Sequence, residues 1–132
     1  MRDKELRLAL ICHGGISLAV YMHGVTKEIW HLARASQNYR GGGPASAGSA
    51  SVYHAMLEQI SARTGTSLRI FADIIAGASA GGINGVFLAQ AIARGASLEP
   101  LTKMWLETAD IDALLDPEAK RSSTLSLSLI HI

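Results

Sequence analysis

The sequence predicts an α/β fold with a mainly parallel sheet and helices packed against it. Two apolar segments, residues 6–12 and 68–76, are each followed by a glycine-containing turn and then by a helical pattern. The long connection between the segments has room for the helical crossover that parallel strands need. The length of 132 residues and a hydrophobic content of 48% suit one domain with a core.

The first half of the chain predicts a strand, a glycine turn and two helices. Residues 6–12 become continuously apolar toward their end, as does a strand that is buried on both faces. Residues 40–51, rich in Gly, Ser and Ala, predict a flexible surface insertion, and residues 52–63 predict a helix ended by Gly65. The first helix has its expected inward face at helical spacing, formed by Leu18, Tyr21, Met22, Val25, Ile29, Leu32 and Ala33.

The second half predicts a strand over residues 68–76 and three helical segments. Residues 80–94 predict a helix closed by Gly95 and apolar nearly all round, so we expect it to be buried. Ser97 can cap another helix, and Asp110 can cap a short turn over residues 111–115. The inward side of the helix after Ser97 is expected to comprise Leu98, Leu101, Met104 and Trp105.

Composition argues against several classes of function. The net charge is +1 and no run of Lys or Arg occurs, so nothing indicates nucleic-acid binding. Cys12 is the single cysteine, and His23, His31 and His54 are scattered, so we expect no disulfide framework and no metal site. Residues 1–7 carry charges of both signs, unlike a signal peptide, which favours a cytoplasmic location with peripheral membrane contact allowed. Residues 74–93 lack formal charges, but their glycines indicate a buried soluble element rather than a membrane span.

The segment Gly77-Ala78-Ser79-Ala80-Gly81 is a GxSxG motif between a predicted strand and a predicted helix. In that context the serine hydroxyl projects from a sharp turn, and small neighbours let a substrate carbonyl approach it. We therefore predict Ser79 as a nucleophile, Gly77 and Gly81 as parts of its elbow, and the N–H of Ala80 as an oxyanion donor. A glycine turn that only packs helix on sheet is the alternative; a phosphate loop is disfavoured because no Gly-Lys-Ser/Thr follows.

A second glycine turn, His13-Gly14-Gly15, follows the first predicted strand. Parallel strands end at the same edge of a sheet, so this turn can lie beside Ser79. The backbone N–H groups of Gly14 and Gly15 would then complete an oxyanion hole.

Together these motifs resemble the patatin-like phospholipases, in particular a divergent bacterial branch. The similarity covers residues 8–25 and 71–87 and continues weakly from Trp105; its most specific part is Asp-Ile-Ile-Ala-Gly-Ala-Ser-Ala-Gly-Gly-Ile-Asn, residues 73–84. The resemblance implies a three-layer α/β/α fold, present here in part, and hydrolysis of lipid acyl esters of the phospholipase A kind without cofactor or metal. It also implies a Ser-Asp dyad whose aspartate lies in an Asp-Gly motif, and the chain has no Asp-Gly.

The chain departs from this family in its oxyanion loop, because His13 precedes only two glycines and Ser17-Leu18 replace a basic residue and a glycine. A non-catalytic lipid- or protein-binding module is therefore the alternative function. His13 is the best local candidate for a base, whereas Asp73 is expected to be structural. The other acidic candidates, expected to be caps and loop charges, are Asp110, Asp112 and Asp116.

The last residues, 127–132, stop in the middle of an apolar pattern. One back-translation of Leu-Ser-Leu-Ile-His-Ile resembles the end of a transposon-based sequencing adapter. We therefore expect residues 1–126 to be part of an acyl hydrolase domain and residues 127–132 to be a non-native read-through tail, with a genuine C-terminal strand as the alternative. On this hypothesis the catalytic aspartate lies beyond the present chain, and this chain alone is inactive.

Overall fold

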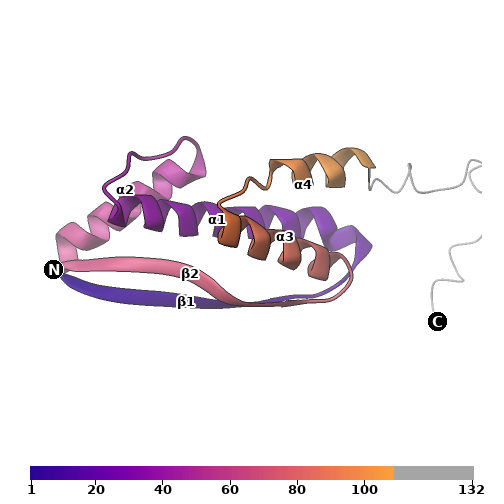
Figure 1. Ribbon diagram of the computed structural model, residues 1–132, viewed down its shortest axis with the longest axis horizontal. Coiled ribbons are helices and arrows are strands. Elements are labelled where there is room, and N and C mark those ends of the chain that lie inside the picture. The colour runs from indigo at the N-terminus through magenta and orange to yellow at the C-terminus, as the bar shows by residue number, and fades with distance from the viewer. Residues whose placement is uncertain (109–132) are drawn as a thin grey trace, which may run out of the picture.

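A computed structural model describes residues 1–108 (Figure 1). The turn expected at residues 111–115 and the tail at 127–132 lie outside these residues. The elements are, in order, β1 (Arg2–Cys12), a 3-10 turn (Ile16–Leu18), α1 (Ala19–Arg40), α2 (Ser49–Thr64), β2 (Thr66–Gly77), α3 (Ala80–Arg94), α4 (Glu99–Lys103) and a π-helical turn (Met104–Thr108).

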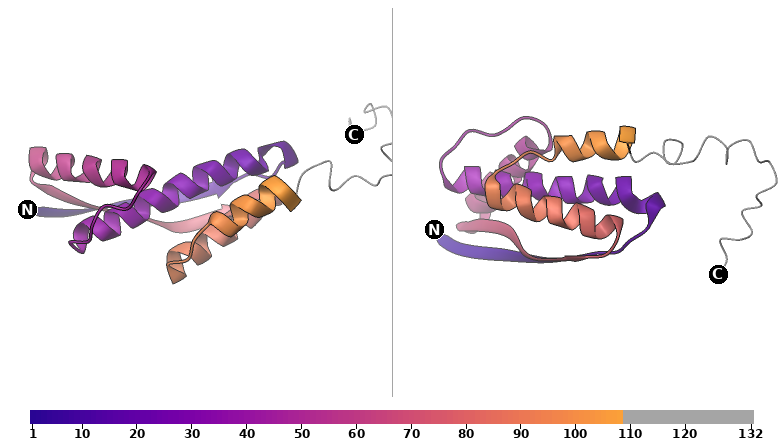
Figure 2. Two further views of the ribbon diagram at one scale, coloured as in Figure 1. Left: turned by 90° about the horizontal axis from the view of Figure 1, so that it is seen from above. Right: turned by 45° about the vertical axis from the view of Figure 1, so that its right-hand side comes forward.

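The two strands are parallel neighbours, as predicted. Arg2 pairs with Thr66 at one end of the pair, and Cys12 pairs with Gly77 at the other. All the described helices lie on one face of the strands, and α1 and α3 both begin at the end where the strands finish (Figures 1 and 2). The α/β class is therefore confirmed, but residues 1–108 form two layers, one of strands and one of helices.

A β-bulge interrupts the pairing halfway along the strands. Leu8 pairs with Ala72 and Ala9 pairs with Ile74, so Asp73 has no partner on β1. Before the bulge Ile70 and Ala72 are buried, and after it Ile75 is the residue that packs against the helical core. The bulge therefore changes which residues of β2 face the helices before the strand reaches Ser79.

The inward face of α1 differs from the predicted one. The buried residues of this helix include Ala19, His23, Thr26 and Trp30. Tyr21 is 71% exposed, and other members of the predicted face are also open. The prediction is confirmed for Met22 and Ile29, which pack against the core. It was wrong for the exposed members because it followed hydrophobicity alone, whereas His23 and Thr26 are buried through hydrogen bonds between and within helices.

The predictions that α3 is buried all round and that β1 is buried on both faces were also wrong. Helix α3 is not buried all round, since Val86 is 67% exposed and Phe87 is 40% exposed. Strand β1 is not buried on both faces, since Ile11 is 73% exposed. In the described residues the sheet has two strands and helices on one face, so the remaining apolar faces have nothing packed on them.

The predicted insertion at residues 40–51 was too long. Helix α1 continues to Arg40 and α2 already begins at Ser49, which leaves residues 41–48 as the connection. The extension of α1 is held by Ser36, whose Oγ donates to the carbonyl of Leu68 and accepts from the N–H of Ile70. The predicted helix ends at Gly65 and Gly95 are confirmed, and both glycines adopt the left-handed conformation.

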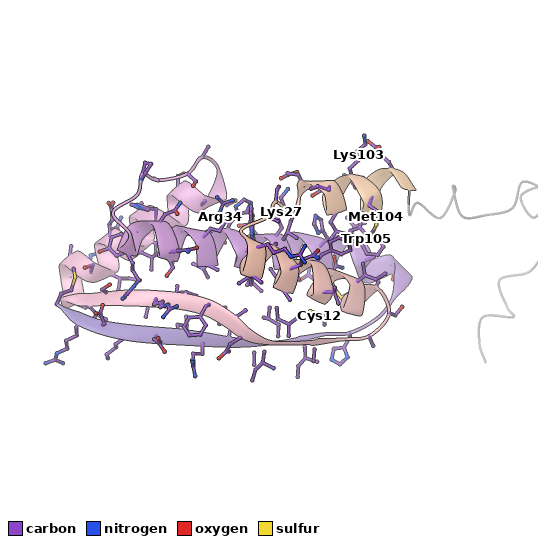
Figure 3. All side chains as sticks on the ribbon, in the orientation of Figure 1. Cys12, Lys27, Arg34, Lys103, Met104 and Trp105 are labelled. Atoms are coloured by element: carbon purple, nitrogen blue, oxygen red, sulfur yellow. The ribbon has the colours of Figure 1, made fainter. Side chains whose placement is uncertain are left out.

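The last described helix agrees with its predicted inward side. Leu98 and Leu101 are each 2% exposed, and Trp105 is 9% exposed. Figure 3 shows Met104 and Trp105 directed toward the other helices and Lys103 directed away from them. The Oγ of Ser97 accepts a hydrogen bond from the N–H of Glu99 at the start of α4.

Candidate active site

Ser79 lies in the turn between β2 and α3, as the motif predicts. Its backbone angles are φ 52° and ψ −131°, and it is the one non-glycine residue with a positive φ among residues 1–108. L-residues rarely adopt this conformation, which costs of order 1–3 kcal/mol. The side chain is exposed at the end of the sheet. The fold therefore holds a strained serine that is exposed at this edge.

The glycines that flank Ser79 are required by close backbone contacts. A Cβ atom at Gly77 would lie 2.6 Å from the carbonyl oxygen of Gly81. A Cβ atom at Gly81 would overlap the carbonyl oxygen of Cys12 and approach that of His13. Helix α3 can therefore start directly above the ends of both strands only because these two positions lack side chains.

The glycine loop after β1 lies against Ser79, as predicted. A Cβ atom at Gly14 would be 2.8 Å from the Cβ of Ser79 and 3.0 Å from the carbonyl oxygen of Ala78. The N–H of Ala78 donates to the carbonyl of Cys12 over 3.2 Å, which ties the two turns together. The turn after β1 and the turn after β2, which are far apart in the sequence, therefore lie together at one edge of the sheet.

This edge presents backbone N–H groups without backbone acceptors. In the part of the chain that the structure describes, no main-chain carbonyl accepts from the N–H of Gly14 or Gly15. Ala80 is the first residue of α3, so its N–H has no acceptor within the helix. The positive end of the α3 dipole adds to these donors. The arrangement has the donors that an oxyanion needs; its use in catalysis stays a prediction.

Of the candidate bases in the described residues, His13 lies at the same edge as Ser79 and Asp73 is paired with an arginine. His13 is exposed at the same edge as Ser79. The carboxylate of Asp73 lies 3.4 Å from Nε of Arg7, in agreement with a structural role. Asp110, Asp112 and Asp116 lie outside the described residues. Within residues 1–108 no group of three or more His, Cys, Asp or Glu side chains is placed to hold a metal ion.

Asn84 is a residue whose role sequence reasoning missed. It is fully buried, its Nδ2 donates to the carbonyl of Ala19 over 3.1 Å, and its Oδ1 accepts from Nε1 of Trp105 over 3.0 Å. Ala19 begins α1 directly after the glycine loop, and Asn84 lies in the first turns of α3 after Ser79. This side chain therefore fixes the starts of the two helices relative to each other. A polar residue in an otherwise apolar helix was the signal that could have found it.

A second polar contact joins α1 to α4. His23 is 4% exposed, and a hydrogen bond of 2.7 Å joins its Nε2 to Oγ1 of Thr102. Burial, together with the nearby charge of Lys27, lowers the pKa of His23 from its ordinary value of 6.5, and Glu99 opposes this shift. Lys27 and Glu99 form an ion pair beside it. The contact holds α4 on α1.

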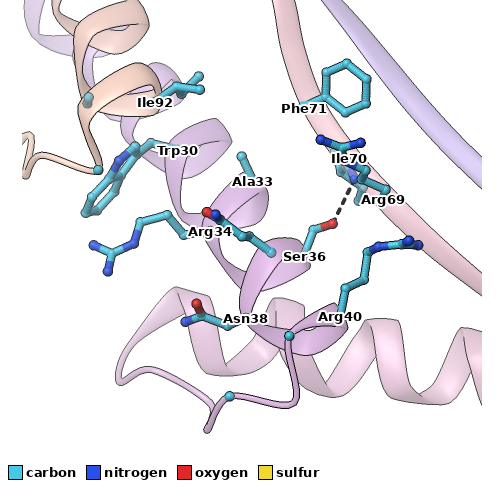
Figure 4. A pocket seen from close by; sticks show the side chains of 15 residues that line it. Trp30, Ala33, Arg34, Ser36, Asn38, Arg40, Arg69, Ile70, Phe71 and Ile92 are labelled. Carbon is cyan, nitrogen blue, oxygen red and sulfur yellow. Dashed lines mark hydrogen bonds between the residues drawn. The ribbon is translucent and has the colours of Figure 1, made fainter.

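One hollow in the described structure lies away from Ser79. It has a volume of about 640 Å³ and lies between α1, β2 and the end of α3, near Trp30 and Phe71 (Figure 4). Two of its arginines are already paired with acids, Arg40 with Asp3 and Arg69 with Glu5. The hollow shares no residue with the turns around Ser79, so it gives no information about that site.

The chain is similar to a short part of a much larger protein. The chain is 37% identical over 135 residues to a protein of Mycobacterium tuberculosis named "Uncharacterized membrane protein Rv3479". The match covers 92% of this chain and 12% of that protein. No family model matches the chain, and no solved structure matches it. No helix within residues 1–108 is long and apolar enough to cross a membrane, and residues 74–93 form the end of a strand, a turn and most of a helix.

Proposed function

We propose that this chain carries the nucleophile and oxyanion loop of a patatin-like serine acyl hydrolase that cleaves lipid acyl esters. The observation that carries the proposal is the backbone of Ser79, held at φ 52° between a strand and a helix with Gly14 packed against it. A strained serine at this point in a fold is the hallmark of a nucleophile elbow. The same segment accounts for the resemblance of residues 71–87 to the family.

In the proposed reaction Oγ of Ser79 attacks the acyl carbonyl carbon as its proton passes to a base. Negative charge develops on the carbonyl oxygen, where N–H groups of Gly14, Gly15 and Ala80 stabilise it. The ester C–O bond then breaks, and the alcohol leaves with the proton that the base accepted; water hydrolyses the acyl-enzyme, which releases the carboxylic acid and restores Ser79. We propose that an aspartate from a further part of the intact protein is the base, as the resemblance implies, in a three-layer fold that residues 1–126 form only in part.

The location of the intact protein is part of the same proposal. A lipid ester substrate is reached at a membrane surface, and the curated relative is named a membrane protein. We propose a cytoplasmic protein in peripheral contact with the membrane. Measuring how the intact protein partitions between cytosol and membranes, before and after a high-salt wash, tests this location.

Labelling with a fluorophosphonate tests the function. The reagent should modify the intact protein covalently at Ser79, and Ser79→Ala should abolish the labelling. Ser97→Ala is the matched control, since this exposed serine precedes α4 and should not affect labelling. A folded intact protein that is not labelled would contradict the hydrolase function and leave the non-catalytic binding module as the better account.

A further inference from the structure

We propose that Trp105 is a positioning residue for the reaction at Ser79 and that it acts through the buried amide of Asn84. This inference rests on the proposed function, because that reaction is what the positioned groups would serve. Trp105 lies in the π-helical turn after α4, far from the GxSxG motif in the sequence. Its indole is 9% exposed and reaches back to α3. The end of the described chain therefore contacts the helix that begins at the site.

The hydrogen bond from Trp105 fixes which way the amide of Asn84 points. An indole nitrogen can only donate, so the amide atom that it meets over 3.0 Å must be the oxygen, Oδ1. The amide nitrogen, Nδ2, is then turned to the carbonyl oxygen of Ala19, 3.1 Å away, which can only accept. The reverse orientation would set two donors against each other at Trp105 and two acceptors against each other at Ala19. Loss of the indole N–H would remove half of this constraint.

The two groups joined by the amide lie at the starts of the helices that lead from the site. Ala19 is the first residue of α1 and follows the glycine loop through one 3-10 turn. Asn84 lies in the first turns of α3, which begins at Ala80. The proposed oxyanion donors come from both elements, since Gly14 and Gly15 precede α1 and Ala80 begins α3. The amide therefore sets the position of one group of donors relative to the other.

Packing around the indole leads to the same two helix starts. Trp105 belongs to the buried hydrophobic cluster that contains Ala19 and Ala80, which are 4% and 8% exposed. In Figure 3 the side chain of Trp105 is directed toward the other helices. Because a close-packed interior transmits strain between neighbouring side chains, a change at Trp105 should reach the starts of both helices.

A separate contact holds the segment of Trp105 on α1. Thr102 of α4 shares a hydrogen bond of 2.7 Å with Nε2 of His23, and Leu101 is 2% exposed in the same core. Loss of the indole N–H alone should therefore leave α4 attached. The effect of the bond to Asn84 can thus be measured apart from the attachment of the helix.

Paired replacement of two buried tryptophans tests the inference in the intact protein. Trp105→Phe keeps an aromatic side chain and removes the donor to Asn84. Trp30→Phe is the matched control, because Trp30 is 5% exposed in the same cluster and its Nε1 has no hydrogen-bond partner within residues 1–108. The rate constant of fluorophosphonate labelling at Ser79 should fall by about tenfold or more in Trp105→Phe, since displaced oxyanion donors stabilise the transition state less. Trp30→Phe should keep the wild-type rate.

A second variant tests whether Trp105 acts through Asn84, and it serves alone if Trp105→Phe does not fold. Asn84→Ala should slow labelling at least as much as Trp105→Phe does, and adding Trp105→Phe to it should slow labelling no further. Three results would overturn the inference. They are labelling of Asn84→Ala at the wild-type rate, equal rates in Trp105→Phe and Trp30→Phe, and additive effects in the double variant.

Hydrogen exchange followed by mass spectrometry examines the same link without any chemistry at Ser79. Trp105→Phe should speed the exchange of backbone amides in the first two turns of α1 and α3, whereas Trp30→Phe should not. Labelling of Ser79 at a rate that Trp105→Phe leaves unchanged would retain the hydrolase and remove the positioning role. Faster exchange in Trp105→Phe, in a protein whose Ser79 is never labelled, would retain the link to the helix starts and remove the hydrolase.

Discussion

Gly14 and Ser79 are in direct contact across the ends of the two strands, since a Cβ atom at Gly14 would lie 2.8 Å from that of Ser79. The two residues belong to turns that are far apart in the sequence. Their contact makes the geometry of the strained serine dependent on the loop after β1. A side chain at Gly14 should therefore disturb both stability and the reactivity of Ser79.

Gly14→Ala should lower the free energy of unfolding by about 1–3 kcal/mol through overpacking and should reduce fluorophosphonate labelling. Gly24→Ala is the control, because a Cβ atom there meets nothing within 4 Å and the residue lies inside α1. That control should raise stability by about 0.5–1 kcal/mol. Urea unfolding of both variants checks the prediction, which fails if the two changes have the same sign.

Gly81→Ala should be more harmful than Gly82→Ala. The first Cβ atom would overlap the backbone of Cys12, whereas the second would lie 3.3 Å from the carbonyl oxygen of Gly77. We expect Gly81→Ala to separate α3 from the strand ends. The variant should then either lose cooperative unfolding or, if it still folds, lose fluorophosphonate labelling of Ser79. Circular dichroism during thermal unfolding compares the two, and a wild-type midpoint for Gly81→Ala would contradict the packing described for this turn.

Ser79→Gly should be more stable than Ser79→Ala by about 1 kcal/mol. Glycine adopts a positive φ without strain, whereas alanine keeps the strain of the native serine. Both variants lose the hydroxyl and should be unlabelled. Equal unfolding midpoints in urea would mean that the backbone at Ser79 is not strained.

Asn84→Ala leaves two buried groups unpaired, the carbonyl of Ala19 and Nε1 of Trp105. Each unpaired group should lower the free energy of unfolding by about 1–3 kcal/mol. Gln90→Ala, on the exposed side of the same helix, should change stability little. Chemical denaturation of the intact protein measures both. If Asn84→Ala also reduces labelling of Ser79 in the folded protein, Asn84 acts as a positioning residue for the site.

Acidification should weaken the attachment of α4 through His23. Burial lowers the pKa of this residue in the folded state, so below pH 6.5 the unfolded chain binds a proton that the folded chain does not. The contribution of His23 to the free energy of unfolding should therefore be fully present above pH 6.5, and the free energy of unfolding should fall as the pH drops below this value. His23→Gln should show a smaller fall than the wild type in urea unfolding measured as a function of pH.

The local elements and the elbow could be predicted from sequence because their signals are local. Alternation of strands and helices, the glycines at 65 and 95, and the GxSxG motif each depend on neighbouring residues. The bulge at Asp73 could not be predicted, because it depends on pairing with β1. Burial was predicted least well: His23 and Asn84 are internal because of partners on other helices, and Tyr21 is exposed because the described sheet has helices on one face.

The pairing of Arg2 with Thr66 also governs the order in which the site can form. The first strand emerges from the ribosome long before its partner has been synthesised, and it has no other strand to join within the described chain. Such distant contacts are slow to form because a long loop must close first. The strain at Ser79 therefore arises late in folding, and nascent chains that end before α3 should lack the strained turn altogether.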